Sequence, residues 1–191
     1  MGHRLSKIYT KTGDGGTTGL GDNTRIEKDH PRMEAIGDVD ELNCSIGVLL
    51  SEEMEGEIQQ FLIEIQHRLF DLGGELSIPG FTLVTEDIIL SLEGEIDKLN
   101  EKLPPLKEFI LPRGDKKTSY SHLCRAVCRR AERKLITLGR DDPNLNTFSL
   151  KMLNRLSDYF FVLSRFFNSK DVYCFYNRNK KEIFNFIFQH N

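Results

Sequence analysis

The sequence predicts an all-α fold, an antiparallel bundle of five helices that follows a glycine-rich arm. From Glu34 onward, apolar residues repeat at the spacing of an α-helix, and proline or glycine interrupts these repeats. No segment alternates apolar and polar residues for long enough to build a sheet, except 172–176 near the end. The length of 191 residues suits a single domain, with an arm over 1–33, the bundle over 34–168 and a C-terminal extension over 169–191.

The five helices are placed by their apolar repeats and by the breaks between them. The repeats cover 39–49, 58–76 and 88–99 for the first three helices, then a fourth up to about Gly139 and a fifth over roughly 146–167. Ser119 or Ser121 is expected to cap the fourth helix, because a hydroxyl at that place accepts a hydrogen bond from the first turn. Apolar residues cover most of the circumference of the fifth helix, so we expect it at the centre of the bundle.

The composition excludes several classes of protein. With 26 Lys and Arg against 29 Asp and Glu, the formal net charge is −3, so the chain lacks the overall basicity of a nucleic-acid coat and any anion site must be local. The four cysteines form no C-x-x-C pair and lack the spacing of zinc ligands, which favours buried, reduced thiols. No apolar run approaches the roughly 18 residues of a membrane span, and no secretion signal is recognisable. We therefore expect a cytoplasmic protein that binds neither nucleic acid nor a membrane.

Glycines and threonines are concentrated at the front of the chain. Five glycines lie within nine residues, from Gly13 to Gly21, and Thr10, Lys11 and Thr12 precede them. Backbone N–H groups of such a loop converge on an oxyanion, while the hydroxyls and the lysine add donors and charge. The segment is not a Walker A loop, since an aspartate follows Gly21 where that motif requires lysine. A phosphate-binding loop and an ordinary flexible arm both stay open as interpretations.

Arginines line one face of the fourth predicted helix. At about 100° per residue, Arg125, Arg129 and Arg133 share one side, opposite an apolar arc that includes Leu123 and Val127. Guanidinium groups pair bidentately with carboxylates and phosphates, so an anion among them would relieve their mutual repulsion. The pattern indicates either an anion site or a solvated charged face in which a neighbouring glutamate offsets the charge.

The fifth predicted helix carries a narrow polar line. Asn154, Asp158 and Arg165 fall within one arc of an otherwise apolar helix. That arrangement is typical of a buried hydrogen-bonded seam between helices or subunits, and it also fits a set of ligand contacts. Spacing does not decide between the two.

Acidic residues mark the start of the first predicted helix. Asp38, Asp40 and Glu41 follow Gly37 within a single turn. Negative charge near a helix N-terminus complements the helix dipole, which is a sufficient structural reason for at least one of them. Pairing with an arginine of the fourth helix is the alternative that spacing leaves open.

Five stretches, taken together and in order, resemble the PduO-type ATP:cob(I)alamin adenosyltransferases. They are 8–14, 37–43, 109–112, 125–133 and 153–158, and the resemblance spans about residues 7–167. It implies a five-helix, ferritin-like bundle of the cobalamin adenosyltransferase type, assembled as a homotrimer with an active site in each cleft between subunits. It also implies the reaction, in which ATP, bound with Mg²⁺, gives its 5′-deoxyadenosyl group to the cobalt of cob(I)alamin and leaves triphosphate.

The resemblance assigns roles to particular residues. For ATP it implies triphosphate ligands from the arm and a second set from a neighbouring subunit: Thr10, Lys11, Thr12, Gly13, Thr18 and Lys28, then Arg129, Arg130, Glu132, Arg133 and Asn154. For the corrinoid it implies an ion pair between subunits, an aromatic that displaces the lower axial ligand of cobalt, and an aromatic shield: Asp40 with Arg125, Phe109, and Phe184. The residues implied in catalysis are Arg129, Asp40, Arg125 and Phe109, and no dedicated metal cage in the protein is implied.

The chain departs from the family pattern in the loop that follows Phe109. Where the family has glycines or small residues, Arg113 and Asp115 flank Gly114, so we expect a stiffer and more charged backbone there. The segment 177–191 matches the family only loosely.

Two other classes of function stay open beside the enzyme. A trimeric module that holds ATP or the corrinoid without turnover would keep every binding residue, whereas a helical scaffold would use its arginines to bind acidic partners. An anaerobic assay of adenosyl transfer distinguishes these classes from the enzyme. The partners that we expect are the small-molecule substrates, with a cobalamin reductase or an adenosylcobalamin-dependent mutase as candidate protein partners.

Overall fold

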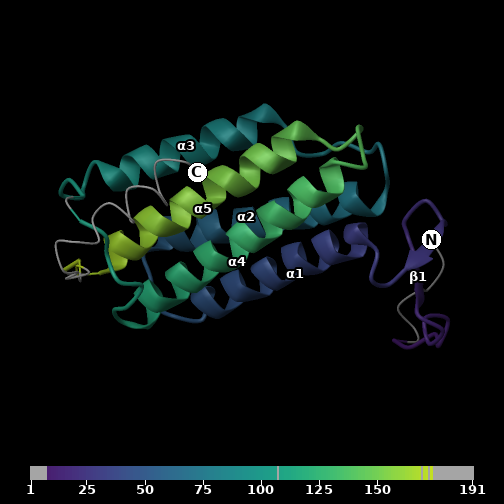
Figure 1. Ribbon diagram of the computed structural model, residues 1–191. Coiled ribbons are helices and arrows are strands. Elements are labelled where there is room, and N and C mark those ends of the chain that lie inside the picture. The colour runs from purple at the N-terminus through teal and green to yellow at the C-terminus, as the bar shows by residue number, and fades with distance from the viewer. Residues whose placement is uncertain (1–7, 107, 169, 172, 174–191) are drawn as a thin grey trace, which may run out of the picture.

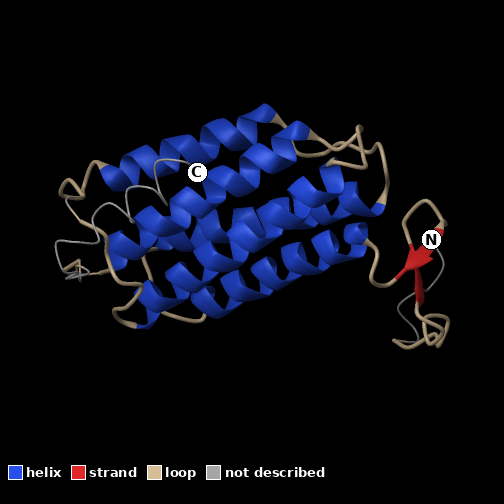
Figure 2. Ribbon diagram, in the orientation of Figure 1, coloured by secondary structure: helices blue, strands red, loops and turns tan. Residues whose placement is uncertain are grey.

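Five helices form the body of the molecule in the computed structural model, which describes residues 8–106, 108–168, 170, 171 and 173 (Figure 1). They are α1 (Pro31–Leu50), α2 (Gly56–Ser77), α3 (Glu86–Asn100), α4 (Lys116–Gly139) and α5 (Thr147–Phe167). Successive helices run in opposite directions, so the predicted antiparallel bundle is confirmed (Figure 2). Among the described residues, none of the helices combines the length and the apolar character that a membrane crossing requires.

The helix α5 lies at the centre of the bundle, as its apolar circumference predicts. It packs against α3 and α4, while α4 also packs against α1, and α1 against α2. Tyr159 and Phe160 of α5 are completely buried. The ring of Phe61 from α2 meets Tyr159 edge to face, with 5.1 Å between ring centroids, which is a favourable arrangement of aromatic rings.

Two expectations about buried residues need correction. Leu123 does not face the core but is 50% exposed, because the core-facing side of α4 runs through Cys124 and Cys128, both of them fully buried. Burial of thiols is correct for these two cysteines and raises the pKa of Cys124 to about 12. It is wrong for Cys44, which lies exposed on the outer side of α1. Cys174 lies outside the described residues.

The start of α4 also differs from the expectation that Ser119 or Ser121 caps it. The N-cap is Asp115, whose Oδ1 accepts a hydrogen bond of 2.8 Å from the backbone N–H of Thr118. Ser121 lies inside the helix, and its hydroxyl donates to the carbonyl oxygen of Lys117 at 2.8 Å. Asp115, which departs from the family pattern, therefore starts the helix that carries the arginines.

The arm holds a small sheet that the period-two pattern did not predict. The strands β1 (Thr17–Gly19) and β2 (Arg25–Glu27) pair antiparallel, with Thr18 opposite Ile26. Strands of three residues are too short to show an alternation of apolar and polar side chains, which is why the sequence pattern missed them. The hairpin projects from one end of the bundle, which we call the arm end; the opposite end, where 101–115 joins α3 to α4, is the loop end (Figure 1).

A buried carboxylate ties the elements of the arm end together. The side chain of Glu75, 6% exposed in the last part of α2, accepts hydrogen bonds from the backbone N–H groups of Leu83 and Val84, the latter at 2.6 Å. It also accepts from Asn146 Nδ2 at 2.9 Å and from the Ser149 hydroxyl at 2.5 Å. This carboxylate therefore joins the end of α2, the segment before α3 and the first turn of α5.

Candidate functional site

The front of the arm is folded into a compact loop beside Lys28. The hydroxyls of Thr10 and Thr12 lie 2.8 Å apart, and the Lys28 side chain lies so close to Gly13 that a Cβ there would be 3.1 Å from Nζ. The backbone N–H of Lys28 donates to the carbonyl of Gly16 at 2.9 Å. This exposed loop therefore contains a pair of hydroxyls and a glycine with the Lys28 ammonium group beside it, which is the composition of an anion cradle.

Arg25 stabilises this loop through hydrogen bonds, a role that the sequence pattern did not predict. Its Nη2 donates to the carbonyl oxygen of Thr12 at 2.8 Å and to the hydroxyl of Thr17 at 2.6 Å. The guanidinium therefore spans the two sides of the loop. Its place opposite Gly19 in the hairpin is set by strand register, a long-range feature that residue spacing does not show.

The arm is fastened to the bundle at Gly21. The backbone N–H of Gly21 donates to the carbonyl of Ser77 at 2.8 Å, and the preceding Leu20 is buried. A Cβ at Gly21 would lie 2.6 Å from Cγ1 of Ile78 and 3.2 Å from the Ser77 carbonyl oxygen. Only glycine fits this close approach, so Gly21 sets where the arm leaves the bundle.

The resemblance implies that the arm binds ATP, so we expect the substitution Gly21→Ala to weaken ATP binding by displacing the arm. An extra methyl group in a tight contact costs roughly 1–3 kcal/mol, which converts to a rise of about tenfold in KM for ATP if the arm detaches. Steady-state kinetics at saturating corrinoid measure this rise. Gly94→Ala is the matched control, because open space surrounds that glycine in α3. An unchanged KM for ATP in Gly21→Ala would contradict the anchoring role.

The arginine face of α4 carries positive charge that no ion pair of the described residues neutralises, although the Asp158 carboxylate lies near enough to interact with the charge of Arg129. Arg125 and Arg129 are half-buried and Arg133 is exposed. Burial, followed by the charge of Arg129, lowers the pKa of Arg125. Within the described part of the chain, no carboxylate lies at ion-pair distance from any of these three side chains. The face is therefore suited to binding an anion from outside this fold.

Arg130, in contrast, is bound to α1. Its Nε lies 3.1 Å from Asp38 Oδ1, and its Nη2 pairs with Glu41. The hydrogen bond to Glu41 is the main reason that the pKa of Arg130 is raised. Two of the three acids, Asp38 and Glu41, thus pair with α4, as one of the two interpretations predicts. The expectation that they start the helix is wrong, because α1 begins at Pro31 and the acid of its first turn is Glu34, so the helix dipole does not explain them.

Glu132 and Asn154 are brought together between α4 and α5. Asn154 Nδ2 donates to Glu132 Oε1 at 3.1 Å, and Asn154 Oδ1 accepts from Arg155 Nη1 at 2.6 Å. Arg155 continues the chain of contacts to Glu93 of α3 at 2.7 Å. Arg165, on the same polar line, is buried and pairs with Asp171 at 2.9 Å. Asn154 and Arg165 are therefore hydrogen-bonded within this chain, as the seam interpretation predicts, whereas Asp158 is exposed and has Arg155 and Arg129 as charged neighbours.

The loop that carries Phe109 lies at the loop end. Phe109 is half-buried, and its neighbour Ile110 forms an antiparallel bridge with Tyr173. Gly114 packs on Thr118, where a Cβ would meet the threonine Cγ2 at 2.6 Å. Phe184 lies outside the described residues.

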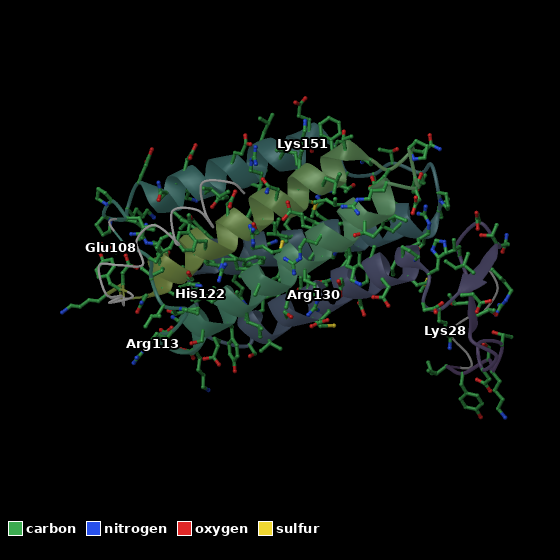
Figure 3. The ribbon with its side chains drawn as sticks, in the orientation of Figure 1. Lys28, Glu108, Arg113, His122, Arg130 and Lys151 are labelled. Carbon is green, nitrogen blue, oxygen red and sulfur yellow. The ribbon has the colours of Figure 1, made fainter. Side chains whose placement is uncertain are left out.

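A single chain does not bring all the expected site residues together. Lys28 lies on the arm, beyond the arm end, whereas Arg130 is near the middle of α4, and His122, Arg113 and Glu108 are at the loop end (Figure 3). Asp40 is exposed on α1 and forms no ion pair with Arg125 within the described residues. The anion cradle of the arm and the free arginines of α4 are therefore separate parts of one molecule.

Comparison with known proteins decides the family. Residues 8–167 match the sequence model of a family described as Cobalamin adenosyltransferase. The chain belongs to this family. A cobalamin adenosyltransferase of Cupriavidus metallidurans is 53% identical over 88% of this chain and 91% of its own length. A corrinoid adenosyltransferase of Bacillus subtilis is 43% identical over 86% of this chain and 88% of its own length.

Solved structures of this cobalamin adenosyltransferase family share the fold. A variant PduO-type ATP:corrinoid adenosyltransferase from Lactobacillus reuteri, complexed with cobalamin and ATP, superposes with a TM-score of 0.85 at 36% identity. The match covers 89% of this chain and all of that one. A second variant from the same organism, complexed with ATP, has a TM-score of 0.83 at 37% identity, covering 87% of this chain and 99% of that one. The resemblance noted from the five sequence stretches is thereby confirmed.

Proposed function

We propose that this protein transfers the 5′-deoxyadenosyl group of ATP to the cobalt of cob(I)alamin. An electron pair of cobalt(I) forms the bond to C5′ while the C5′–O bond breaks, and triphosphate leaves with the bonding electrons. The products are adenosylcobalamin and triphosphate. Besides membership of the family, the observation that carries the proposal is the row of arginines on α4 without carboxylate partners among the described residues, since a departing triphosphate needs such charge.

The nucleotide is held, in this proposal, from two sides. The arm supplies the triphosphate ligands Thr10, Lys11, Thr12, Gly13, Thr18 and Lys28, and α4 and α5 supply Arg129, Arg130, Glu132, Arg133 and Asn154. Because these sets lie apart in one chain, we place the arm of one subunit over the α4 face of its neighbour, in a homotrimer with three such sites. Arg130 would then act mainly by fixing α4 to α1, through Asp38 and Glu41.

The corrinoid is placed at Phe109, Asp40 and Arg125, with Phe184 as a further aromatic contact. The half-buried ring of Phe109 would fill the lower axial side of cobalt, and an apolar group there favours the four-coordinate state from which cobalt(I) forms. Asp40, exposed on α1, would pair with Arg125 of a neighbouring subunit. The enzyme's part is orientation, charge neutralisation and exclusion of water, because the reactive atom belongs to the corrinoid.

Magnesium fits this site as an ion carried by ATP. Among the described residues, no three His, Cys, Asp or Glu side chains gather into a set that would hold a metal ion. Phosphate oxygens are ligands that Mg²⁺ prefers, and the ion would offset negative charge on the leaving group. The arm hydroxyls of Thr10 and Thr12 would orient the same phosphates.

The test of the function is an anaerobic assay with ATP, Mg²⁺ and chemically reduced cobalamin. The expected result is the absorbance change of cobalt–carbon bond formation, together with one triphosphate for each adenosylcobalamin formed. Binding of ATP and corrinoid without this change would overturn the enzymatic proposal in favour of a holding module. Sedimentation analysis of the same protein tests the trimer.

Asp40→Ala is expected to weaken corrinoid binding without affecting nucleotide binding. Loss of one partner of an ion pair at a subunit contact raises the KM for cob(I)alamin by about tenfold, while the KM for ATP stays within about twofold. The two KM values measured in the same preparation check this. Asp97→Ala, which removes an exposed acid from α3, is the control. If the variant kept the wild-type KM for cob(I)alamin, the pairing of Asp40 with Arg125 would be wrong.

A further inference from the structure

Three buried polar atoms on one stripe of α4 have no hydrogen-bond partner among the described residues. They are Thr118 Oγ1, His122 Nδ1 and Arg125 Nε. The residues follow one another at spacings of four and three, so their side chains lie on the same face of the helix. Thr118 is completely buried and His122 is 5% exposed, whereas Arg125 is half-buried. The stripe therefore runs from a covered end at Thr118 to an open end at Arg125.

Unpaired polar atoms in such number need a reason. A buried donor or acceptor without a partner costs free energy, and native structures leave few of them. Other polar side chains of α4 are hydrogen-bonded. The hydroxyl of Ser121 donates to the Lys117 carbonyl oxygen, and Glu132 accepts a hydrogen bond from Asn154. Four other buried side-chain atoms of the described residues are also unpaired, on Asp38, Asn43, Arg68 and Tyr159, but they are scattered over α1, α2 and α5, whereas three lie on this one face of α4.

The chemistry of the three atoms restricts what they bind. Arg125 Nε–H only donates, while the Thr118 hydroxyl donates or accepts. Burial, together with the nearby charge of Arg125, lowers the pKa of His122 to about 4, so the imidazole is neutral near pH 7 and either donates or accepts at Nδ1. A group that offers an acceptor to Arg125 and a donor to His122 satisfies both. A primary amide does this with its carbonyl oxygen and its NH₂ group.

We propose that His122 and Arg125, backed by Thr118, bind a primary amide side chain of the corrinoid. This inference rests on the proposed function, which places the corrinoid beside Phe109 and Arg125. The edge of a corrinoid carries several slender amide arms, and one of them enters at the half-buried Arg125 and reaches His122. His122 is then a positioning residue that fixes the rotation of the macrocycle about cobalt and so its alignment with C5′ of ATP.

A carboxylate in the same place fits less well. It offers acceptors alone, so His122 would have to gain a proton against the burial and the positive charge that disfavour its cationic form. An inorganic anion meets the same obstacle. The amide therefore differs from both, because its NH₂ group donates a hydrogen bond to the neutral imidazole of His122.

The test is an equilibrium titration with cob(II)alamin, followed by absorbance, at saturating ATP. His122→Leu is expected to raise the Kd for cob(II)alamin about tenfold, the worth of one or two hydrogen bonds, with the Kd for ATP unchanged. His122→Asn, whose amide group replaces Nδ1, is expected to stay within about threefold of wild type. Ser121→Ala is the matched control, because that hydroxyl is bonded inside the helix.

Corrinoids with one amide hydrolysed to a carboxylate give the second measurement. Wild type is expected to bind one of the monocarboxylates about tenfold more weakly than cob(II)alamin. His122→Leu is expected to bind the two with similar Kd, because the loss of discrimination shows that the amide and His122 interact with each other. The melting temperature of His122→Leu should equal or exceed that of wild type, since an unpaired polar group is removed. A lower melting temperature with unchanged Kd for cob(II)alamin would show a structural histidine and overturn the proposal. Wild type that forms no adenosylcobalamin would instead overturn the function itself.

Discussion

Arg129→Ala is expected to lower kcat for adenosyl transfer by about 10²–10³, the usual loss when one donor to a developing negative charge is removed. The charge on triphosphate increases as the C5′–O bond breaks, so an arginine beside it stabilises the transition state more than the bound substrate. Arg129 is half-buried on α4, next to Arg125, and within the described residues it has no carboxylate partner. Its side chain is therefore available to a ligand.

The stability of the Arg129→Ala protein separates this role from a structural one. Removing a positive charge that lowers the pKa of Arg125 relieves repulsion, so helicity and melting temperature should match wild type or rise slightly. Arg129→Lys keeps the charge but loses the planar guanidinium fork, so we expect its kcat to lie between those of wild type and Arg129→Ala. Arg140→Ala, at the exposed C-cap of α4, is the control with unchanged kinetics. Loss of helicity or of the native oligomer in Arg129→Ala would show that the arginine holds the structure together.

Glu75→Ala is expected to lower the free energy of unfolding by about 3 kcal/mol, which is large for a single substitution. The carboxylate accepts from Leu83, Val84, Asn146 and Ser149, and its removal leaves these donors unpaired in a buried place. Urea unfolding followed by circular dichroism measures the change. The KM for ATP should also rise, because Gly21 fastens the arm to Ser77, two residues beyond Glu75.

Glu75→Gln serves as the conservative variant. Its carbonyl oxygen still accepts from three of the donors, and its NH₂ group faces the Ser149 hydroxyl, which accepts as well as donates. The expected loss is about 1 kcal/mol. Glu53→Ala, at an exposed position, should change stability by less than about 0.5 kcal/mol. Equal unfolding midpoints for Glu75→Ala and Glu53→Ala would mean that water replaces the carboxylate at no cost.

The local sequence pattern predicted the five helices, but it did not predict where every helix begins or how the arm folds. The apolar repeat over 146–167 predicted α5 and its central position, and the structure adds that Asn146 caps this helix, accepting a hydrogen bond from the Phe148 N–H at 3.0 Å. The cap of α4 was misplaced at Ser119 or Ser121, since Asp115 lies before the repeat begins. The hairpin of the arm was missed because strands of three residues carry no readable period.

The candidate site shows the same division. Spacing alone placed Arg125, Arg129 and Arg133 on one face of α4, because helical periodicity is a local property. It did not show that Arg130 turns to Asp38 and Glu41, since that depends on how α4 packs against α1. Residue spacing also did not predict a role for His122, whose only sequence signal is its position three residues before Arg125.

The sequence by itself determined the class of fold and the row of cations on α4, which follow from residue type and short-range spacing, and its resemblance to known sequences indicated the family. Only the tertiary structure decided which of those cations are free. A charged side chain is available to a ligand when packing brings no carboxylate to it, and packing joins residues as far apart as Asp38 and Arg130. The same reason applies to His122, whose neutrality comes from burial, a property of the folded chain that the linear order of residues does not contain.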